Sequence, residues 1–268
     1  MSRAASALLA LCLLLTPAAA GETLILATTT STQDSGLLDA LLPAFEAATG
    51  IRVKSVAVGS GEALAMGKRG DADVLLVHSK AAEDLFMSEG FGALRLDVMY
   101  NDFVVVGPAA DPAKAKGLDA VEAFRKIFEA RAPFASRGDR SGTHKKEQDL
   151  WKKAGLDPAG EPWYLDAGQG MGETARIASE KRAYALIDRG TWLALEKTLD
   201  LAILSEGAKD LLNTYRVIVV SPEKHPKTHA AEARRFAEWL VTPQAQKAIG
   251  EFGREKFGQS LFVPDARK

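Results

Sequence analysis

The chain of 268 residues has a single cysteine, Cys12, so no disulfide can form within it. The fold must therefore be stabilised by buried apolar side chains and not by covalent cross-links. Hydrophobic residues make up 47% of the sequence and charged residues 26%. This is an ordinary globular composition, with enough apolar material for one large core or two smaller ones.

The sequence also lacks an excess of either charge, because 34 Lys and Arg residues oppose 35 Asp and Glu residues, for a formal net charge of −1. No basic run is longer than a few residues, which argues against a nucleic-acid-binding protein. Only four histidines occur. Two of them, His225 and His229, have the spacing of a helical metal pair, but Pro226 lies between them, so we expect no metal site.

Long apolar runs are missing beyond the N-terminus, and no later segment predicts a membrane span. Residues 1–20 combine an early Arg3, an apolar stretch too short to cross a bilayer and small residues before a cleavage point. This pattern is typical of a secretory signal peptide. A leucine precedes Cys12 where a lipid anchor needs a small residue. We expect a mature chain that begins near Glu22 and is exported to the periplasm.

Strand-like and helix-like segments alternate along the remaining sequence. Strands are predicted at 23–27, 51–58, 73–77, 132–136 and 184–188, and helices at 37–49, 60–70, 79–90, 118–131, 142–154, 172–182, 190–198, 228–241 and 243–252. This alternation predicts an α/β fold with a mostly parallel sheet and helices on both faces.

Two longer extended segments, 97–108 and 211–222, have the same character, and each ends in proline. The simplest topology makes them a two-strand hinge between two α/β lobes. Lobe I would hold residues 22–105 and 216–268, and lobe II residues 106–215. A ligand would lie in the cleft between the lobes, which hinge closure would cover.

Three loops between a strand and a helix share one chemistry: the hydroxyl row Thr28–Ser31, the Gly59–Gly61 turn and the SRGDRSGTH segment at 136–144. Each combines hydroxyl donors or small residues with a helix N-terminus, where unpaired N–H groups and a partial positive charge favour anions. Any one of these loops alone is more simply explained as a helix cap. Together with Arg137, they predict a site for a small anion.

The loop R-x-D-x-S-G-T resembles the anion-binding loop of periplasmic phosphate-binding proteins. From about residue 23 to 263 the chain more closely resembles the tungstate-binding proteins of ABC-type tungstate transporters. The matching stretches are ATTTSTQDSGLLDALLPAFEAATG, ADVLLVHSKAAEDLFMSEG, SRGDRSGTHKKEQDLW and GQGMGETARIASEKRAYALIDRGTWL. The resemblance implies a type II periplasmic binding-protein fold. Carried over by position, it implies these oxyanion-binding residues: Thr29, Thr30, Ser31, Ser60, Arg137, Ser141, Gly142 and Thr143.

The donor inventory separates the candidate oxyanions. Tungstate, molybdate and sulfate are dianions near neutral pH and only accept hydrogen bonds, whereas phosphate keeps a proton and needs an acceptor. The obvious carboxylate is Asp139, which we expect to brace Arg137 and not to meet the ligand. Asp71 and Asp73 are expected away from the cleft. This reasoning disfavours phosphate, but the preference for tungstate over molybdate depends on the resemblance alone.

Several assignments stay open at this point: which hydroxyl of Thr28–Ser31 points into the cleft, and whether His78 or the glycine-rich loop 168–176 touches the ligand. A hydrolase of phosphate or sulfate esters is a rival, suggested by His144 near Ser141. The chain, however, has no G-x-S-x-G elbow. We therefore expect an extracytoplasmic solute-binding protein and not an enzyme. It would be monomeric, without a cofactor, and would deliver its oxyanion to an ABC permease driven by an ATPase.

Overall fold

The computed structural model describes residues 23–266, and the predicted signal peptide lies outside this range. Within these residues twenty-one labelled helices and strands follow one another, together with two 3₁₀ helices. Those of the first half are β1 (Thr23–Thr29), α1 (Thr30–Asp34), α2 (Leu37–Thr49), β2 (Arg52–Val58), α3 (Ser60–Arg69), β3 (Val74–Val77), α4 (Lys80–Ser88), β4 (Gly92–Gly107), α5 (Ala120–Glu129) and β5 (Phe134–Ser136). Those of the second half are α6 (Gly142–Ala154), β6 (Tyr164–Asp166), α7 (Met171–Lys181), β7 (Ala185–Asp188), α8 (Arg189–Leu195), β8 (Ala202–Ser205), β9 (Leu212–Val220), α9 (Ala230–Leu240), α10 (Pro243–Glu251), α11 (Arg254–Phe257) and β10 (Val263–Pro264).

The predicted pattern is confirmed for most elements, since the long helices and strands fall within a few residues of their expected ranges. Helix α2 shows why: Leu37, Leu38, Leu41 and Phe45 form its buried stripe, and Gly50 ends it in a left-handed conformation. The prediction missed α1, α11 and the short strands β6, β8 and β10. These segments are too short to show a period of their own.

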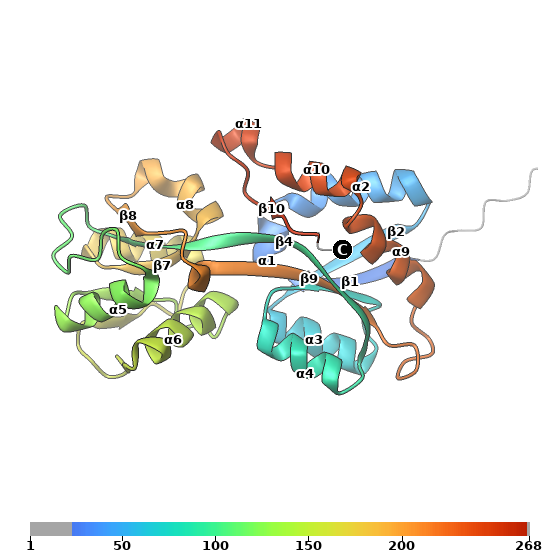
Figure 1. Cartoon of the computed structure of the whole chain (residues 1–268), viewed down its shortest axis with the longest axis horizontal. Coiled ribbons are helices and arrows are strands. Elements are labelled where there is room, and N and C mark those ends of the chain that lie inside the picture. The colour runs from blue at the N-terminus through green and yellow to red at the C-terminus, as the bar shows by residue number, and fades with distance from the viewer. Residues whose placement is uncertain (1–22, 267–268) are drawn as a thin grey trace, which may run out of the picture.

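The strands β1, β2 and β3 are parallel, as their alternation with helices predicts. The long strand β4 departs from that expectation, because it pairs antiparallel with β9 along residues 92–102 and with β7 and β8 along residues 103–107. Strand β9 in turn pairs antiparallel with β3. One strand is therefore shared by two groups of strands, and the sheet is mixed (Figure 1).

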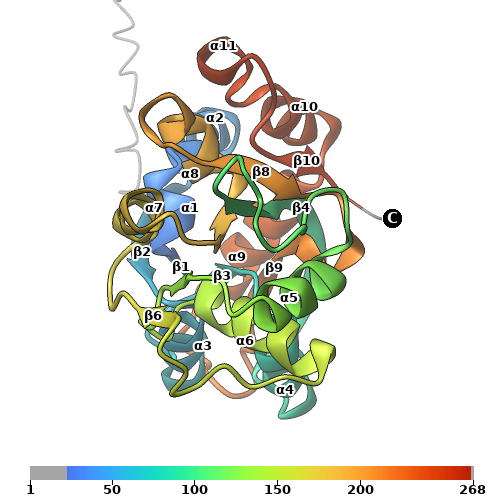
Figure 2. The ribbon, with the colours of Figure 1, turned by 90° about the vertical axis from the view of Figure 1, so that its left-hand side faces the viewer.

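Buried apolar side chains gather on both sides of these crossing strands. Two clusters draw on residues 24–99 and 215–262, and two others on residues 103–211. Figure 1 shows the resulting lobes side by side, joined by β4 and β9, and Figure 2 looks at the molecule from the side of α5–α8. The predicted division into lobe I (22–105, 216–268) and lobe II (106–215) stays a proposal that this clustering supports.

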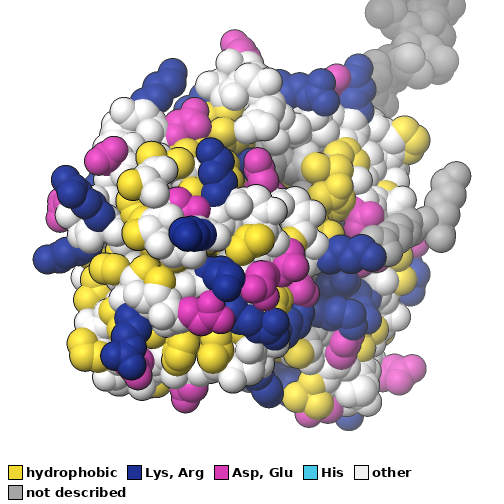
Figure 3. Space-filling view, turned by 60° about the vertical axis from the view of Figure 1, so that its left-hand side comes forward, with side chains coloured by type: hydrophobic (Ala, Val, Ile, Leu, Met, Phe, Trp, Pro, Cys, Tyr) yellow, Lys and Arg dark blue, Asp and Glu magenta, His cyan; other side chains and the backbone are white. Residues whose placement is uncertain are grey.

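Positive and negative side chains are interspersed over the face shown in Figure 3. Within residues 23–266 no helix is long and apolar enough to cross a membrane.

Candidate functional site

A cavity of about 540 Å³ lies between the lobes and is lined from both. Five helices begin at its wall: α1 and α3 of lobe I, and α6, α7 and α8 of lobe II. All predicted ligand residues line this cavity, namely Thr29, Thr30, Ser31, Ser60, Arg137, Ser141, Gly142 and Thr143. Their contact with an oxyanion stays a prediction, but the fold brings together loops that are far apart in the sequence.

The structure resolves which hydroxyls of the first loop are available. Thr28 is buried, and its hydroxyl donates to the carbonyl of Leu76 at 2.8 Å. Thr29 is also buried and caps α1 by accepting from the backbone N–H of Thr32. Thr30 and Ser31 are exposed to the cavity. Thr30 and Ser31 are therefore the more exposed hydroxyls of this row, while Thr29 also holds the helix start in place.

The second loop supplies a hydroxyl donor, that of Ser60, which makes no hydrogen bond with the described residues. Helix α3 begins after Gly59, so no side chain caps its first N–H groups. The hydroxyl of Ser60 is buried in the cavity wall, and it has no hydrogen-bond partner among the described residues. A buried hydroxyl without a partner costs free energy unless a ligand satisfies it.

The third loop holds a guanidinium at the wall of lobe II. Arg137 forms an ion pair with Asp139, as predicted, and Asp139 also accepts from the backbone N–H of Ser141 at 3.1 Å. Burial by itself would raise the pKa of Asp139, but the bonds from Ser141 and Arg137 outweigh it and lower that pKa. The Nε of Arg137 is buried and has no partner in the described part of the chain. The guanidinium is thus braced by Asp139 through a terminal nitrogen, while its Nε lacks a partner among the described residues.

Gly138 makes this loop possible. It has φ of +62°, and a Cβ at this position would lie 1.3 Å from Oδ1 of Asp166. Any larger residue would push the carboxylate of Asp166 aside and would be strained by the positive φ.

Two features left open by the sequence reach the cavity. His78 lines it, and so do Gly170, Met171 and Gly172 at the start of α7, which like α3 has no side-chain cap. Uncapped helix starts offer backbone N–H groups to an anion.

The sequence interpretation missed the start of α8, where Asp188, Gly190 and Thr191 line the cavity. Arg189 fixes this helix to the hinge, because its guanidinium donates twice to the carboxylate of Asp102, at 2.6 Å each. Asp188 directly precedes α8, and an aspartate in this position predicts a helix N-cap, so the sequence alone could have indicated this helix start. The hinge residues of the lining, Asn101, Asn213 and Tyr215, carried no such local signal.

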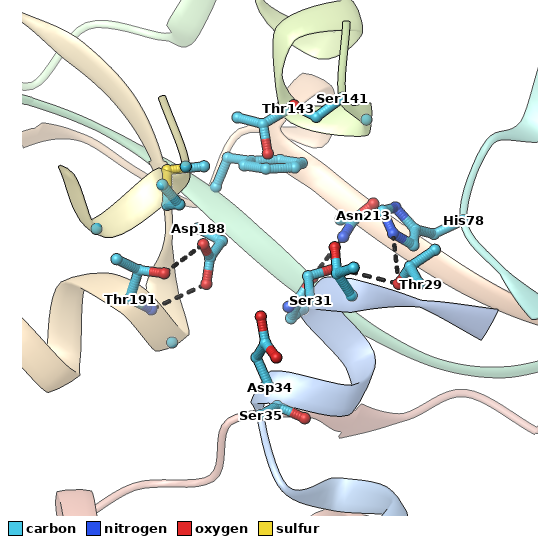
Figure 4. A pocket seen from close by; sticks show the side chains of 18 of the residues that line it. Thr29, Ser31, Asp34, Ser35, His78, Ser141, Thr143, Asp188, Thr191 and Asn213 are labelled. Carbon is cyan, nitrogen blue, oxygen red and sulfur yellow. Dashed lines mark hydrogen bonds between the residues drawn. The ribbon is translucent and has the colours of Figure 1, made fainter. Parts of the chain in front are cut away.

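A site for a dianion is expected to have no free carboxylate facing the ligand, and this expectation stays a prediction. Asp34, Glu173 and Asp188 all line the cavity, and Figure 4 shows Asp34 and Asp188 there. Asp188 is engaged, since its oxygens accept from the N–H and the hydroxyl of Thr191 at 2.9 and 2.7 Å. Glu173 forms an ion pair with Arg176. Asp34 has no hydrogen bond or ion pair within residues 23–266, so it is the acceptor that a protonated ligand would need.

Other carboxylates lie where they were expected. Asp73 accepts from the N–H groups of Ile25 and His229 at 2.7 and 2.9 Å, and Asp71 pairs with Arg69, so neither borders the cavity. Among residues 23–266 no group of three or more His, Cys, Asp or Glu side chains is placed to hold a metal ion.

Two α/β lobes that share a pair of long strands, with donors from both lobes around one cleft, define the class of the type II periplasmic binding proteins. A family model described as a PBP superfamily domain matches residues 16–244. The tungstate-binding protein TupA of Peptoclostridium acidaminophilum is 54% identical over 248 residues, 91% of this chain and 86% of that protein. The chain therefore belongs to the PBP superfamily and, within it, to the family of TupA tungstate-binding proteins.

Solved structures agree with this assignment. The tungstate-binding protein TupA of Desulfovibrio alaskensis G20 is similar with a TM-score of 0.85 and 47% identity, over 91% of this chain and 99% of that one. A structure described as the tungstate ABC transporter from Geobacter sulfurreducens has a TM-score of 0.75 and 49% identity, over 86% and 99%.

Proposed function

We propose that this protein is an extracytoplasmic solute-binding protein that captures tungstate between its lobes and delivers it to an ABC permease. The observation that carries the proposal is a pair of buried donors on residues that line one cavity from opposite lobes, the hydroxyl of Ser60 and the Nε of Arg137. Both are without partners among the described residues, and an oxyanion would satisfy both.

The helix starts add to this donor set. The uncapped first turns of α3 and α7 face the same space from different lobes. Charge-assisted hydrogen bonds contribute about 1.5–3 kcal/mol each, so six or seven of them supply roughly 10–20 kcal/mol before the ligand's desolvation is subtracted. Nanomolar affinity needs about 12 kcal/mol. A closed site of this composition is sufficient for tight capture.

The family supports the transport role, because relatives are named as tungstate-binding and anion-binding proteins of ABC transporters. Export to the periplasm, a monomeric state and docking to the permease are proposed on the same ground, together with the signal-like residues 1–20. In this proposal the protein performs no chemical reaction and needs no cofactor.

Asp34 favours one alternative ligand. A carboxylate that is free among the described residues, at the wall of an anion site, is what protonated phosphate requires. The test is a calorimetric titration of the purified protein with tungstate, molybdate, sulfate and phosphate at neutral pH. Tight binding of tungstate with phosphate silent is the expected result. Preferential binding of phosphate would assign Asp34 to the ligand, and binding of none of the four would refute the proposed site.

A further inference from the structure

His78 contacts both lobes at the floor of the cleft. It follows β3, is partly buried, and its ring lies 4.6 Å from that of Tyr215 on β9. Its Nε2 is 3.2 Å from the hydroxyl of Thr29. From lobe II, Gly142 lies so close that a Cβ there would be 3.0 Å from Cε1 of the ring. The imidazole therefore touches the first turn of α6 and the cap of α1 at the same time.

Asn213 determines which ring nitrogen of the neutral imidazole carries the proton. Its amide nitrogen donates to Oδ1 of Asn101 at 2.8 Å and to the hydroxyl of Tyr215 at 3.1 Å. The amide oxygen is left as the acceptor beside the ring, and the side chain of Asn213 raises the pKa of His78, as an acceptor next to a ring N–H does. Asn213 and Thr29 lie at different edges of the ring (Figure 4). The nitrogen facing Asn213 is thus protonated, and Nε2, facing Thr29, has the lone pair.

The hydroxyl of Thr29 has the matching requirement. It accepts from the backbone N–H of Thr32 at 3.3 Å and lies 2.7 Å from the hydroxyl of the same residue. That buried Thr32 hydroxyl has no other partner among the described residues, so it donates to Thr29. Both acceptor positions of Thr29 are then filled, and its own proton is available for Nε2 of His78 or for the hydroxyl of Ser31, 3.1 Å away. Burial lowers the pKa of His78 to about 4, which agrees with a neutral ring.

A dianion in the cleft changes this balance, because it accepts hydrogen bonds only and attracts the proton of Thr29. If that hydroxyl turns to the ligand, the lone pair of Nε2 faces an oxygen that no longer donates to it. A proton on Nε2 removes this repulsion and places a positive charge near the anion.

We propose that capture of the oxyanion is coupled to uptake of one proton by His78, which changes Nε2 from an acceptor into a donor and releases the Thr29 hydroxyl to the ligand. This inference rests on the proposed function. His78 acts in it as a positioning residue, since it controls the direction of a neighbouring hydroxyl.

Other charges face the ring and its cleft. Lys146 on α6 opposes a positive charge on His78, and burial raises the pKa of Tyr215 beside it. The cavity wall adds the cations Arg137 and Lys256 and the carboxylates Asp34, Glu173 and Asp188.

Glu147, behind the Arg137 loop, is a second group that could take up a proton, so the experiment must distinguish its proton uptake from that of His78. Burial raises its pKa to about 7, so it too can exchange a proton when an anion enters. The variant Glu147→Gln removes this contribution.

The test is calorimetric titration with micromolar tungstate in buffers of different ionisation enthalpy, at about pH 6.5 and about pH 8.5. The dependence of the binding heat on the buffer measures the protons taken up. We expect uptake at the lower pH that falls towards zero at the higher pH, and a Kd that rises by up to about tenfold per pH unit where one proton is bound. Uptake should be lost in His78→Gln and kept in Glu147→Gln and in His225→Gln, a matched substitution outside the cavity lining.

Tungstate binding without proton uptake, or the same uptake in His78→Gln as in the native protein, would overturn this inference and leave the proposed function intact. Absence of any oxyanion binding would refute the proposed function and this coupling together. If His78→Gln does not fold, ¹⁵N NMR of the native protein decides: the ring nitrogens of His78 should change from a neutral to a protonated signature on saturation. Unchanged ring signals would refute the coupling.

Discussion

The substitution Arg137→Ala tests the cavity most directly. The side chain is 16% exposed, is paired with Asp139 on one edge, and has a buried Nε that no described residue satisfies. Its removal deletes at least one charge-assisted hydrogen bond to the anion, worth about 1.5–3 kcal/mol. The expected loss of affinity is at least roughly tenfold and extends to about 150-fold.

A second effect also lowers the affinity for the anion, because Asp139 keeps its negative charge near the cleft after its partner is removed. It still accepts from the backbone N–H of Ser141, so the loop should keep its shape and the protein should stay folded. The double variant Arg137→Ala/Asp139→Asn separates the two contributions. It should recover the part of the loss that comes from an unpaired carboxylate and leave the part that comes from the missing donor.

The assay is calorimetric titration with tungstate, accompanied by thermal unfolding of each variant. Arg125→Ala is the matched control, since Arg125 lies on α5 in the same lobe and bonds to Glu122 and to the backbone carbonyl of Ala154, neither of which lines the cavity. An exposed ion pair contributes at most about 1 kcal/mol to stability, and this one lies away from the cavity, so the control should leave the affinity unchanged. Native affinity in a folded Arg137→Ala protein would refute the assigned site.

Three further predictions concern other parts of the molecule. Ser60→Ala should weaken tungstate binding roughly tenfold, the loss of one charge-assisted bond, without lowering the melting temperature; a lower melting temperature with native affinity would contradict the role of this hydroxyl. Gly142→Ala should weaken binding, because the new Cβ lies 3.0 Å from Cε1 of His78 and the ring must shift to make room; native affinity would show that binding does not need this close contact. Since burial raises the pKa of Glu147 from 4.5 to about 7, the folded state binds the extra proton, and the free energy of unfolding should fall by about 3 kcal/mol as pH rises through this window. Urea unfolding at several pH values should show this decrease in the native protein but not in Glu147→Gln. An equal decrease in both proteins would show that another group causes it.

The local sequence was sufficient for the class of fold and for most of the elements. Periodic apolar positions such as those of α2 and terminators such as Gly50 act within one or two turns, so they can be read without knowledge of the rest of the chain. The three candidate anion-binding loops were identified for the same reason. Each is a strand-to-helix junction, and parallel strands bring such junctions to one edge of a sheet.

The short strands β6, β8 and β10 could not be predicted in this way. Strand β8, for example, is paired only with the far end of β4, and its residues carry no alternation long enough to detect. These strands form because they pair with segments that are distant in sequence, and the local residue pattern does not indicate those partners.

The sequence by itself determined that this is a two-lobed α/β protein, and that hydroxyls, glycines and Arg137 stand at helix starts suited to an anion. Only the tertiary structure decided how those hydroxyls are used, because Thr28 donates to the carbonyl of Leu76 and Thr29 accepts from the backbone N–H of Thr32. It also placed Asp34 beside the anion site and His78 against Asn213. Burial, hydrogen-bond competition and contact between lobes depend on residues that are far apart along the chain, so they arise only when the two lobes fold against each other.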